Sequence, residues 1–240
     1  MVTGANTGIG QGIAVCIARA GGAVIGVGRS AMDETARLVE AEAAGFTPVQ
    51  CDLADAAAAR SMFDTAWDEH GPIDGLVNNA GIIRRADALD FAEADWDDVM
   101  DVNLKTLFML SQAFARRLVA AGRPGKIVNV ASLLSFQGGI RVASYTASKH
   151  GVLGITRLLA NEWAAKGINV NAVAPGYIET NNTEALRADA DRNAAILGRI
   201  PAGRWGRPED IGDTAVYLLA PASDYMHGAV IPVDGGWLAR

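Results

Sequence analysis

Short apolar runs alternate with helix-length segments along the whole chain, and this alternation constrains the fold more than any other feature. The expected strands are Ala23–Gly28, Pro48–Asp52, Gly75–Asn78, Lys126–Ala131, Ile168–Ala174 and Ala229–Val233. The expected helices are Gly10–Ala20, Asp33–Ala43, Asp55–Glu69, Trp96–Ala121, Tyr145–Lys166 and Pro208–Leu219. Several strands are apolar throughout, which is typical of a parallel sheet covered on both faces. We therefore predict an α/β fold with a doubly wound parallel sheet and helices on both faces, in a single domain spanning residues 1–240.

Two parts of the chain depart from this rhythm. Residues 177–208 are long and polar, and we expect a substrate lid within them, because long segments inside compact domains are usually functional. Met1-Val2-Thr3 would be only the end of a first strand. Either the true start lies upstream, or this strand is abnormally short.

The overall charge and the cysteine content limit the classes of partner. A formal net charge of -6 argues against nucleic acid or an anionic membrane surface as the partner. No apolar run is long enough to span a bilayer. Cys16 and Cys51 match no metal or redox spacing, and the three histidines match no metal site. We expect a cytoplasmic protein with reduced cysteines and no catalytic metal.

A glycine-rich segment, Thr3-Gly4-Ala5-Asn6-Thr7-Gly8-Ile9-Gly10, overlaps the end of the expected first strand and precedes the first expected helix. Glycines let the backbone approach a pyrophosphate closely, and the N-terminus of the next helix attracts its negative charge. The spacing is not G-x-G-x-x-G, so a glycine-rich turn without a ligand is the alternative. Following a strand and opening a helix, the segment favours a Rossmann-type dinucleotide-binding fold. The expected contacts are Gly4, Asn6, Thr7, Gly8, Ile9 and Gly10.

The end of the second strand bears on the choice of coenzyme. An acidic residue usually binds the adenine ribose of NAD at this place, but Gly28 stands here. Arg29 could bind the 2′-phosphate of NADP, or it could be a solvated arginine at the end of a strand. Thr7 lacks the basic side chain that often helps to bind that phosphate. The residues therefore leave both NAD and NADP open.

A tyrosine and a lysine stand four residues apart at the start of a predicted helix. This spacing puts Tyr145 and Lys149 on one face, and a neighbouring ammonium favours the phenolate of a tyrosine, which otherwise titrates at about pH 10. Tyr145 can then take a proton from an alcohol or return one to a ketone. Such a pair alone is usually a solvated surface pair. Ser132, just past a strand at the carboxyl edge of the sheet, can hold the reacting oxygen and so makes a catalytic site.

These motifs together resemble those of the short-chain dehydrogenases/reductases over essentially the whole chain. The matching positions are Thr3–Gly10, Asp52, Asn78–Gly81, Asn103, Ser132, Tyr145-x-x-x-Lys149 and Pro175-Gly176. The resemblance implies a homotetrameric, NAD(P)-dependent oxidoreductase acting on CH–OH groups. It also implies that Asn103 holds a water linking Lys149 to solvent, and that Lys149 binds the nicotinamide ribose. The further coenzyme contacts that it implies are Gly28, Arg29, Asp52, Leu53, Asn79, Ala80, Gly81, Tyr145, Pro175, Gly176, Ile178 and Thr180.

Other stretches resemble one group in that family, the 2-dehydro-3-deoxy-D-gluconate 5-dehydrogenases. They are Ile83–Arg85, Asp95–Met100, Ser135–Val142, Ala174–Thr183, Arg199–Gly206 and Val233–Arg240. This resemblance implies interconversion of a 2-keto-3-deoxy sugar acid and its 2,5-diketo form, usually with NAD, in uronate catabolism. The alternatives are a gluconate 5-dehydrogenase or another sugar-acid or ketone reductase, an acyl-carrier-linked ketoreductase, and a dinucleotide sensor without turnover. The last would be expected to lack part of the catalytic set.

A hexonate carboxylate needs a charged partner, ideally an arginine. Arg141 is the first candidate, because it lies between Ser132 and Tyr145 in the chain. Arg84 and Arg85 follow a coenzyme-lining turn, and Arg204 belongs to the expected lid. A surface ion pair is an equally good role for each arginine. The expected substrate contacts are Ser132, Tyr145, Arg84, Arg141, Arg204 and, for a sugar hydroxyl, Gln137.

Overall fold

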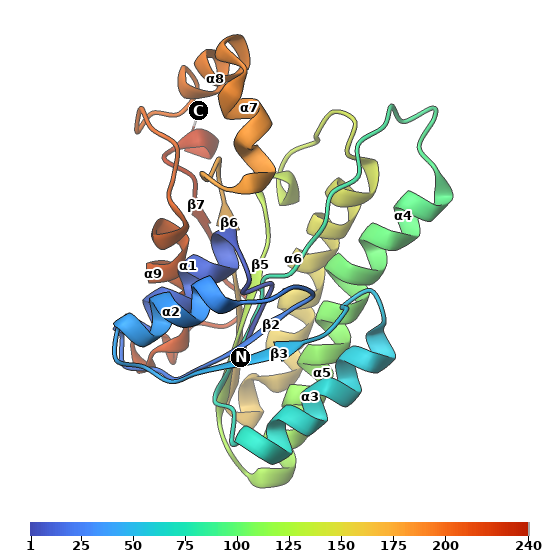
Figure 1. Ribbon diagram of the computed structural model, residues 1–240. Coiled ribbons are helices and arrows are strands. Elements are labelled where there is room, and N and C mark those ends of the chain that lie inside the picture. Colours follow the sequence, from blue (N-terminus) through green and yellow to red (C-terminus); the bar gives the residue numbers. More distant parts are fainter. Residues whose placement is uncertain (240) are drawn as a thin grey trace.

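The computed structural model describes residues 1–239, and in this range the strands form one seven-stranded parallel sheet in the order β3-β2-β1-β4-β5-β6-β7 (Figure 1). The strands are β1 (Val2–Thr3), β2 (Val24–Gly28), β3 (Phe46–Gln50), β4 (Gly75–Asn78), β5 (Gly125–Val130), β6 (Ile168–Pro175) and β7 (Val230–Val233). The chain moves outward from β1 to β3, returns to β4, and then moves outward on the other side. The carboxyl ends of β1 and β4 therefore flank the point where ligands of doubly wound sheets bind.

Helices cover both faces of the sheet (Figure 1). They are α1 (Gly8–Arg19), α2 (Asp33–Ala41), α3 (Ala56–His70), α4 (Glu93–Met100), α5 (Leu107–Ala121), α6 (Ala143–Trp163) and α9 (Pro208–Leu219). Successive strand residues face opposite sides, so Leu76 shares a core with Phe63 of α3 and Phe114 of α5. Val77 shares the other core with Ile13 of α1. The predicted doubly wound sheet with two buried faces is confirmed.

Most element boundaries differ from the prediction by one to three residues, and two elements differ in a way that changes the description. The strand predicted at Pro48–Asp52 begins two residues earlier, because Phe46 already pairs with Val24 of β2. The helix predicted at Trp96–Ala121 is helical throughout, but it begins earlier, at Glu93, and a π-helical segment, Asp101–Thr106, lies between α4 and α5. The two-residue β1 pairs with both β2 and β4, so this short strand lies inside the sheet.

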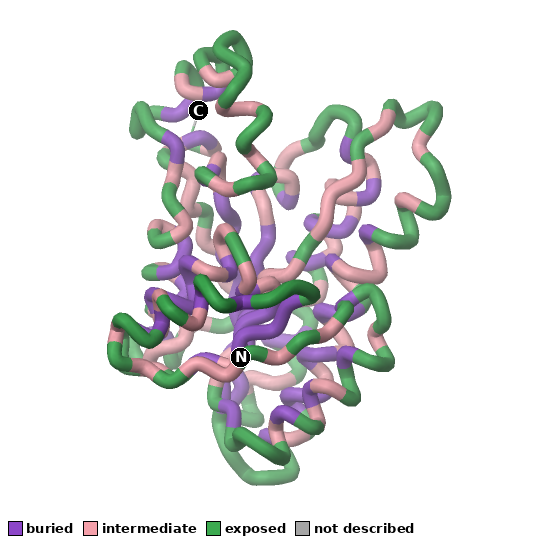
Figure 2. Tube along the Cα trace, in the orientation of Figure 1, coloured by how far each residue is buried: buried purple, intermediate pink, exposed green. Residues whose placement is uncertain are grey.

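The predicted lid region contains two short helices, α7 (Glu184–Ala188) and α8 (Ala190–Leu197), which stand beyond the carboxyl edge of the sheet near the C-terminal end (Figure 1). Most of their residues are exposed or half-buried (Figure 2). A small apolar core nevertheless lies beneath them, and its buried members are Leu133, Ile196, Ile200, Trp205 and Trp237. This core joins the loop after β5 to the C-terminal segment.

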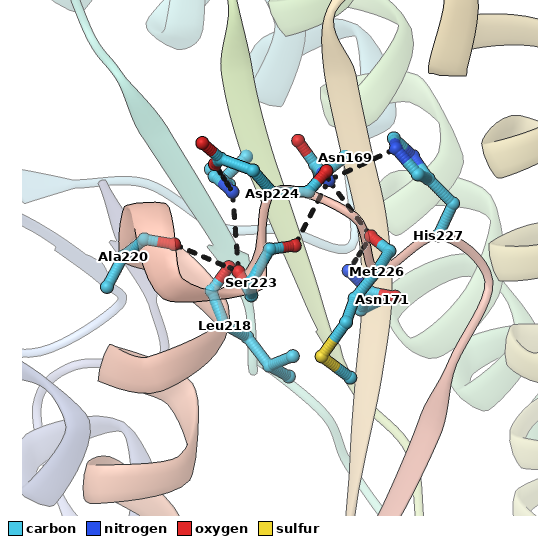
Figure 3. A network of polar contacts seen from close by, with 9 residues as sticks. Asn169, Asn171, Leu218, Ala220, Ser223, Asp224, Met226 and His227 are labelled. Carbon is cyan, nitrogen blue, oxygen red and sulfur yellow. Dashed lines mark hydrogen bonds and ion pairs between the residues drawn. The ribbon is translucent and has the colours of Figure 1, made fainter.

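A polar network fixes the chain between α9 and β7 at the other end of β6 (Figure 3). The side-chain amide of Asn169 donates to the carbonyl oxygens of Asp224 and Met226 at 2.8 and 2.9 Å, and that of Asn171 donates to Met226 O at 2.8 Å. Lys126 of β5 forms an ion pair with Asp224 at 2.6 Å. Buried amides that make several hydrogen bonds specify one loop position, and Ala229 N, just before β7, donates to Asn171 Oδ1 at 2.9 Å.

Candidate active site

The phosphate loop between β1 and α1 is shaped by its glycines. Gly4 and Gly8 have φ values of +67° and +58°, which residues with a side chain rarely adopt. A Cβ at Gly10 would overlap the carbonyl oxygen of Gly4 and the amide of Asn79. The helix α1 begins at Gly8, so its free N–H groups face the loop. The segment fits the pyrophosphate of a dinucleotide.

Thr3 connects this loop to the turn after β4, and the sequence interpretation gave it no separate role. Its hydroxyl donates to Val77 O at 3.2 Å and accepts from the backbone N–H groups of Asn79 and Ala80, both at 3.0 Å. The amide of Asn79 donates in turn to Thr3 O at 2.9 Å. The expected coenzyme contacts at residues 4–10 and 79–81 therefore belong to one rigid unit.

At the carboxyl end of β2, the structure brings Gly28 against Asn6. A Cβ at Gly28 would lie 3.0 Å from the side-chain oxygen of Asn6. The Asn6 amide donates to the hydroxyl of Ser30 at 2.9 Å, and Arg29 is exposed beside them. The polar groups here are hydroxyl, amide and guanidinium, without a carboxylate on residues 28–30. This donor-rich set fits a phosphate better than a bare ribose diol.

The remaining expected coenzyme contacts follow β3 and β6 at the same edge. Asp52 accepts from Ala54 N at 3.0 Å, and Leu53 is buried. Ile178 is buried and forms an isolated β-bridge with Gly206. A Cβ at Gly8 would lie 3.3 Å from Thr180, so the segment after β6 reaches the phosphate loop. Pro175 ends β6 beside Val233, and Gly176 follows it and lies against Asp234.

The catalytic candidates converge between β5 and α6. Ser132 begins the short turn after β5, and its hydroxyl accepts from Leu134 N at 3.1 Å and interacts with the hydroxyl of Tyr145. The ammonium of Lys149 lies 5.6 Å from the centre of the Tyr145 ring and donates to Val130 O at 2.7 Å. The spacing on α6 and the end of β5 thus bring a hydroxyl, a phenol and an ammonium together, as expected from the sequence.

The electrostatics of this group differ from the expectation. Burial raises the pKa of Tyr145, and the opposing effects of the Ser132 hydrogen bond and of the Arg85 charge are smaller. Lys149 is not among the causes of this shift, and its ammonium donates to Val130 O. Burial lowers the pKa of Lys149 from 10.5 to about 8. Tyr145 is therefore a neutral phenol at neutral pH.

Asn103 lies in the π-helical segment, and its side chain is fully engaged. Its oxygen accepts from Ile82 N at 2.8 Å, while its amide donates to Ile82 O at 3.0 Å and to the Ser148 hydroxyl at 3.2 Å. A Cβ at Gly81 would lie 3.3 Å from Asn103 Oδ1 and 3.8 Å from Lys149 Nζ. Asn103 is thus next to the lysine, but a water link from it would have to use its backbone carbonyl.

The arginines expected to hold a carboxylate are partly occupied by acidic neighbours. Arg84 forms ion pairs with Asp95 at 3.3 Å and with Asp98 at 3.1 Å. Arg204 binds both carboxylate oxygens of Asp210, at 2.7 and 3.0 Å, and lowers the pKa of that carboxyl. From the sequence, a surface ion pair and a substrate contact were equally good roles for Arg84 and Arg204. In the structure both arginines form ion pairs.

Arg141 and Arg85 come from two loops that are connected by a backbone hydrogen bond. Arg141 has a φ of +63°, and its carbonyl accepts from Ala86 N at 3.2 Å. Its side chain is exposed and lies 3.3 Å from Asp87. Sequence reasoning named Arg85 together with Arg84 but left it out of the expected substrate contacts. It has no hydrogen bond or ion pair with any residue in the range 1–239, and its charge reaches Tyr145.

Comparison with known proteins agrees with this geometry. A family model of short-chain dehydrogenases/reductases, described as Enoyl-(Acyl carrier protein) reductase, matches residues 4–238. The chain belongs to the short-chain dehydrogenase/reductase family. It is an oxidoreductase of the kind that acts on CH–OH groups.

Individual members of the short-chain dehydrogenase/reductase family match the whole chain. The 2-dehydro-3-deoxy-D-gluconate 5-dehydrogenase of Dickeya dadantii is 55% identical over 240 residues, which are 100% of this chain and 95% of that protein. The gluconate 5-dehydrogenase of Gluconobacter oxydans is 40% identical over 238 residues, with 98% and 93% covered. A solved structure of a candidate 2-deoxy-D-gluconate 3-dehydrogenase from Agrobacterium tumefaciens, with bound NADP, has a TM-score of 0.95 and 64% identity, with 100% and 95% covered.

Two further observations describe this short-chain dehydrogenase/reductase. Within residues 1–239, no three or more His, Cys, Asp or Glu side chains are grouped so that they could hold a metal ion. In that same range, no helix has the length and apolar character needed to cross a membrane.

Proposed function

We propose that this enzyme interconverts 2-dehydro-3-deoxy-D-gluconate and its 2,5-diketo form in uronate catabolism. The convergence of Ser132, Tyr145 and Lys149 carries the oxidoreductase part of the proposal. The sugar acid is supported by the relative from Dickeya dadantii, which is more similar to this chain than the gluconate 5-dehydrogenase is. Gluconate 5-dehydrogenase activity is the second candidate, because that relative also spans nearly the whole chain.

The chain's own residues would handle the proton. Bound coenzyme supplies or accepts the hydride at the reacting carbon. Ser132 would hold the reacting oxygen, and Tyr145, neutral because burial raises its pKa, would donate its proton to a ketone oxygen. Lys149 and the backbone of Asn103 would return a proton toward the phenol. Oxidation of the alcohol needs the phenolate, so we expect oxidation to be favoured by a higher pH than reduction.

The variant Tyr145→Phe tests this mechanism. Loss of the hydroxyl should lower kcat by about 100- to 10,000-fold, which is the usual contribution of a positioned acid or base. The dissociation constant of the coenzyme, measured by fluorescence titration, should stay close to that of the wild type. A variant that turns over at a near-normal rate would rule out Tyr145 as the proton donor.

We infer that NADP(H) is the preferred coenzyme. Gly28, held against Asn6, leaves no carboxylate to bind a ribose diol, and the exposed Arg29 stands beside the Asn6–Ser30 hydrogen bond. The NADP bound to the relative from Agrobacterium tumefaciens supports this choice over NAD. For Arg29→Ala, the dissociation constant of NADPH should rise by about 10- to 100-fold, as for a lost charged hydrogen bond, with that of NADH little changed. Equal effects on both coenzymes would contradict the assignment.

We further propose that Arg85, with Arg141, holds the substrate carboxylate. This is supported by the unpaired guanidinium of Arg85 in the described chain and by the direct contact between the two loops. Arg85→Gln should raise KM for the sugar acid by about 10- to 100-fold without changing coenzyme affinity. The matched control is Arg84→Gln, because Arg84 is already paired with Asp95 and Asp98. An equal rise in KM for both variants would exclude a specific role of Arg85.

A cytoplasmic homotetramer is also part of the proposal. Val119 on α5 and Leu158 on α6 are 50% and 45% exposed, which supports burial of these helices between subunits. Light scattering after size exclusion should give the mass of four chains. A monomer under the assay conditions would contradict this assembly.

A further inference from the structure

Trp237 is held more firmly than its place near the end of the chain suggests. It is 6% exposed, and its short helical turn is capped by Asp234, whose carboxylate accepts from the N–H groups of Gly236 and Leu238 at 2.8 and 2.9 Å. The Tyr177 ring lies 4.7 Å from the indole, between ring centres. The Arg199 guanidinium stacks on it at 3.8 Å. These contacts fix the direction in which the indole N–H points.

That N–H donates to the side-chain oxygen of Gln137 at 3.2 Å. An indole is a donor only, so its partner must be the carbonyl oxygen of the amide and not the NH₂ group. Trp237 thereby decides which way the amide of Gln137 faces. The NH₂ group is left pointing away from the indole. Within residues 1–239 this NH₂ group has no partner. It is also not buried, so a ligand can reach it.

Gln137 belongs to the loop that carries the reacting-oxygen contact. It follows Ser132 by five residues, and its backbone N–H donates to Leu133 O at 3.1 Å. Leu133 is itself buried in the apolar core shared with Trp237. The amide therefore sits between the catalytic loop and the C-terminal segment, and it has two donors to offer there.

We infer that Gln137 is a specificity-determining residue that offers only N–H donors to an oxygen acceptor of the sugar acid, and that Trp237 is the residue that positions it. The inference rests on the proposed function and deepens it. A keto or hydroxyl oxygen of the substrate would accept from Gln137, which cannot act there as an acceptor. Rotation of the amide would place its NH₂ group against the indole N–H, so the bond from the indole would be lost. The amide oxygen would then face the substrate oxygen that is proposed to accept from Gln137.

A double-mutant cycle on Gln137→Leu and Trp237→Phe tests the inference, with KM, kcat and the NADPH dissociation constant measured for each protein. Gln137→Leu should raise KM by about 3- to 10-fold, the usual effect of one neutral hydrogen bond, with kcat and coenzyme affinity unchanged. Trp237→Phe keeps an aromatic ring and should raise KM by a smaller factor. In the Gln137→Leu background, Trp237→Phe should have no further effect on KM.

A second variant and a matched control complete the cycle. Gln137→Glu still accepts from the indole but offers no donor, so its KM should rise at least as far as that of Gln137→Leu. Trp205→Phe is the control, because its indole N–H donates to Asn193 at 2.8 Å in the same core. Its effect should be the same in both Gln137 backgrounds.

Two results would overturn the inference: equal effects of Trp237→Phe on KM in both backgrounds, or a wild-type KM for Gln137→Glu. The cycle uses whichever acid the wild type turns over best in a panel of keto-deoxy sugar acids and gluconate. A wrong substrate assignment therefore appears in the wild-type ranking, and a wrong role of Gln137 appears in the cycle.

Discussion

Replacing Lys149 by methionine should stabilise the fold while it abolishes turnover. Lys149 is 4% exposed, and burial lowers its pKa from 10.5 to about 8. A pKa difference of one corresponds to about 1.4 kcal/mol, so keeping this ammonium in the folded protein costs about 3 kcal/mol at pH 7. Methionine removes that cost but also removes the 2.7 Å hydrogen bond to Val130 O, which offsets about 1 kcal/mol. We expect Lys149→Met to raise the free energy of unfolding by about 2 kcal/mol at pH 7.

The pH dependence distinguishes this cause from a change in packing. Because the pKa of Lys149 is lower in the folded protein, the unfolded chain binds more protons between pH 8 and 10.5, and the stability contributed by this group rises with pH there. The advantage of Lys149→Met should therefore be full below pH 8 and should shrink toward pH 10. Urea unfolding of both proteins at pH 7 and at pH 9.5 measures it. A difference of the same size at both values would refute the reasoning.

Three further outcomes are expected. Gly10→Ala should abolish coenzyme binding in a fluorescence titration, because its Cβ would overlap the phosphate loop, whereas Gly45→Ala, with open space around it, should bind normally. Thr3→Val should lower the free energy of unfolding by about 2 kcal/mol in urea, since three backbone groups lose their partner. Ketone reduction should decline above about pH 8 in a pH profile of kcat, as the Lys149 ammonium loses its proton.

The parts of the site that local sequence determines could be predicted. The four-residue spacing of Tyr145 and Lys149 becomes one face of α6, and the glycines from Gly4 to Gly10 become a loop that ends at a helix N-terminus. Ser132 follows a strand, so its place at the carboxyl edge depends only on the parallel sheet. Each inference needs only helix or strand periodicity together with the direction of the strands.

The parts that depend on distant partners could not be predicted. Which arginine is available for a carboxylate is decided by Asp95, Asp98 and Asp210, and sequence spacing does not show that Arg84 and Arg204 meet them. The direction of the Tyr145 pKa was also missed, because it depends on burial by the folded chain. The π-helical segment interrupts a continuous helical pattern without a glycine or a proline to mark it.

The substrate assignment is tested most directly by comparing kcat/KM of the wild type for 2-dehydro-3-deoxy-D-gluconate and for D-gluconate, each with NADP and with NAD. We predict that kcat/KM for 2-dehydro-3-deoxy-D-gluconate with NADP is at least about tenfold higher than kcat/KM for D-gluconate. One favourable hydrogen bond supplies a ratio of this size. A higher value for gluconate with either coenzyme would contradict the assignment and favour a gluconate 5-dehydrogenase.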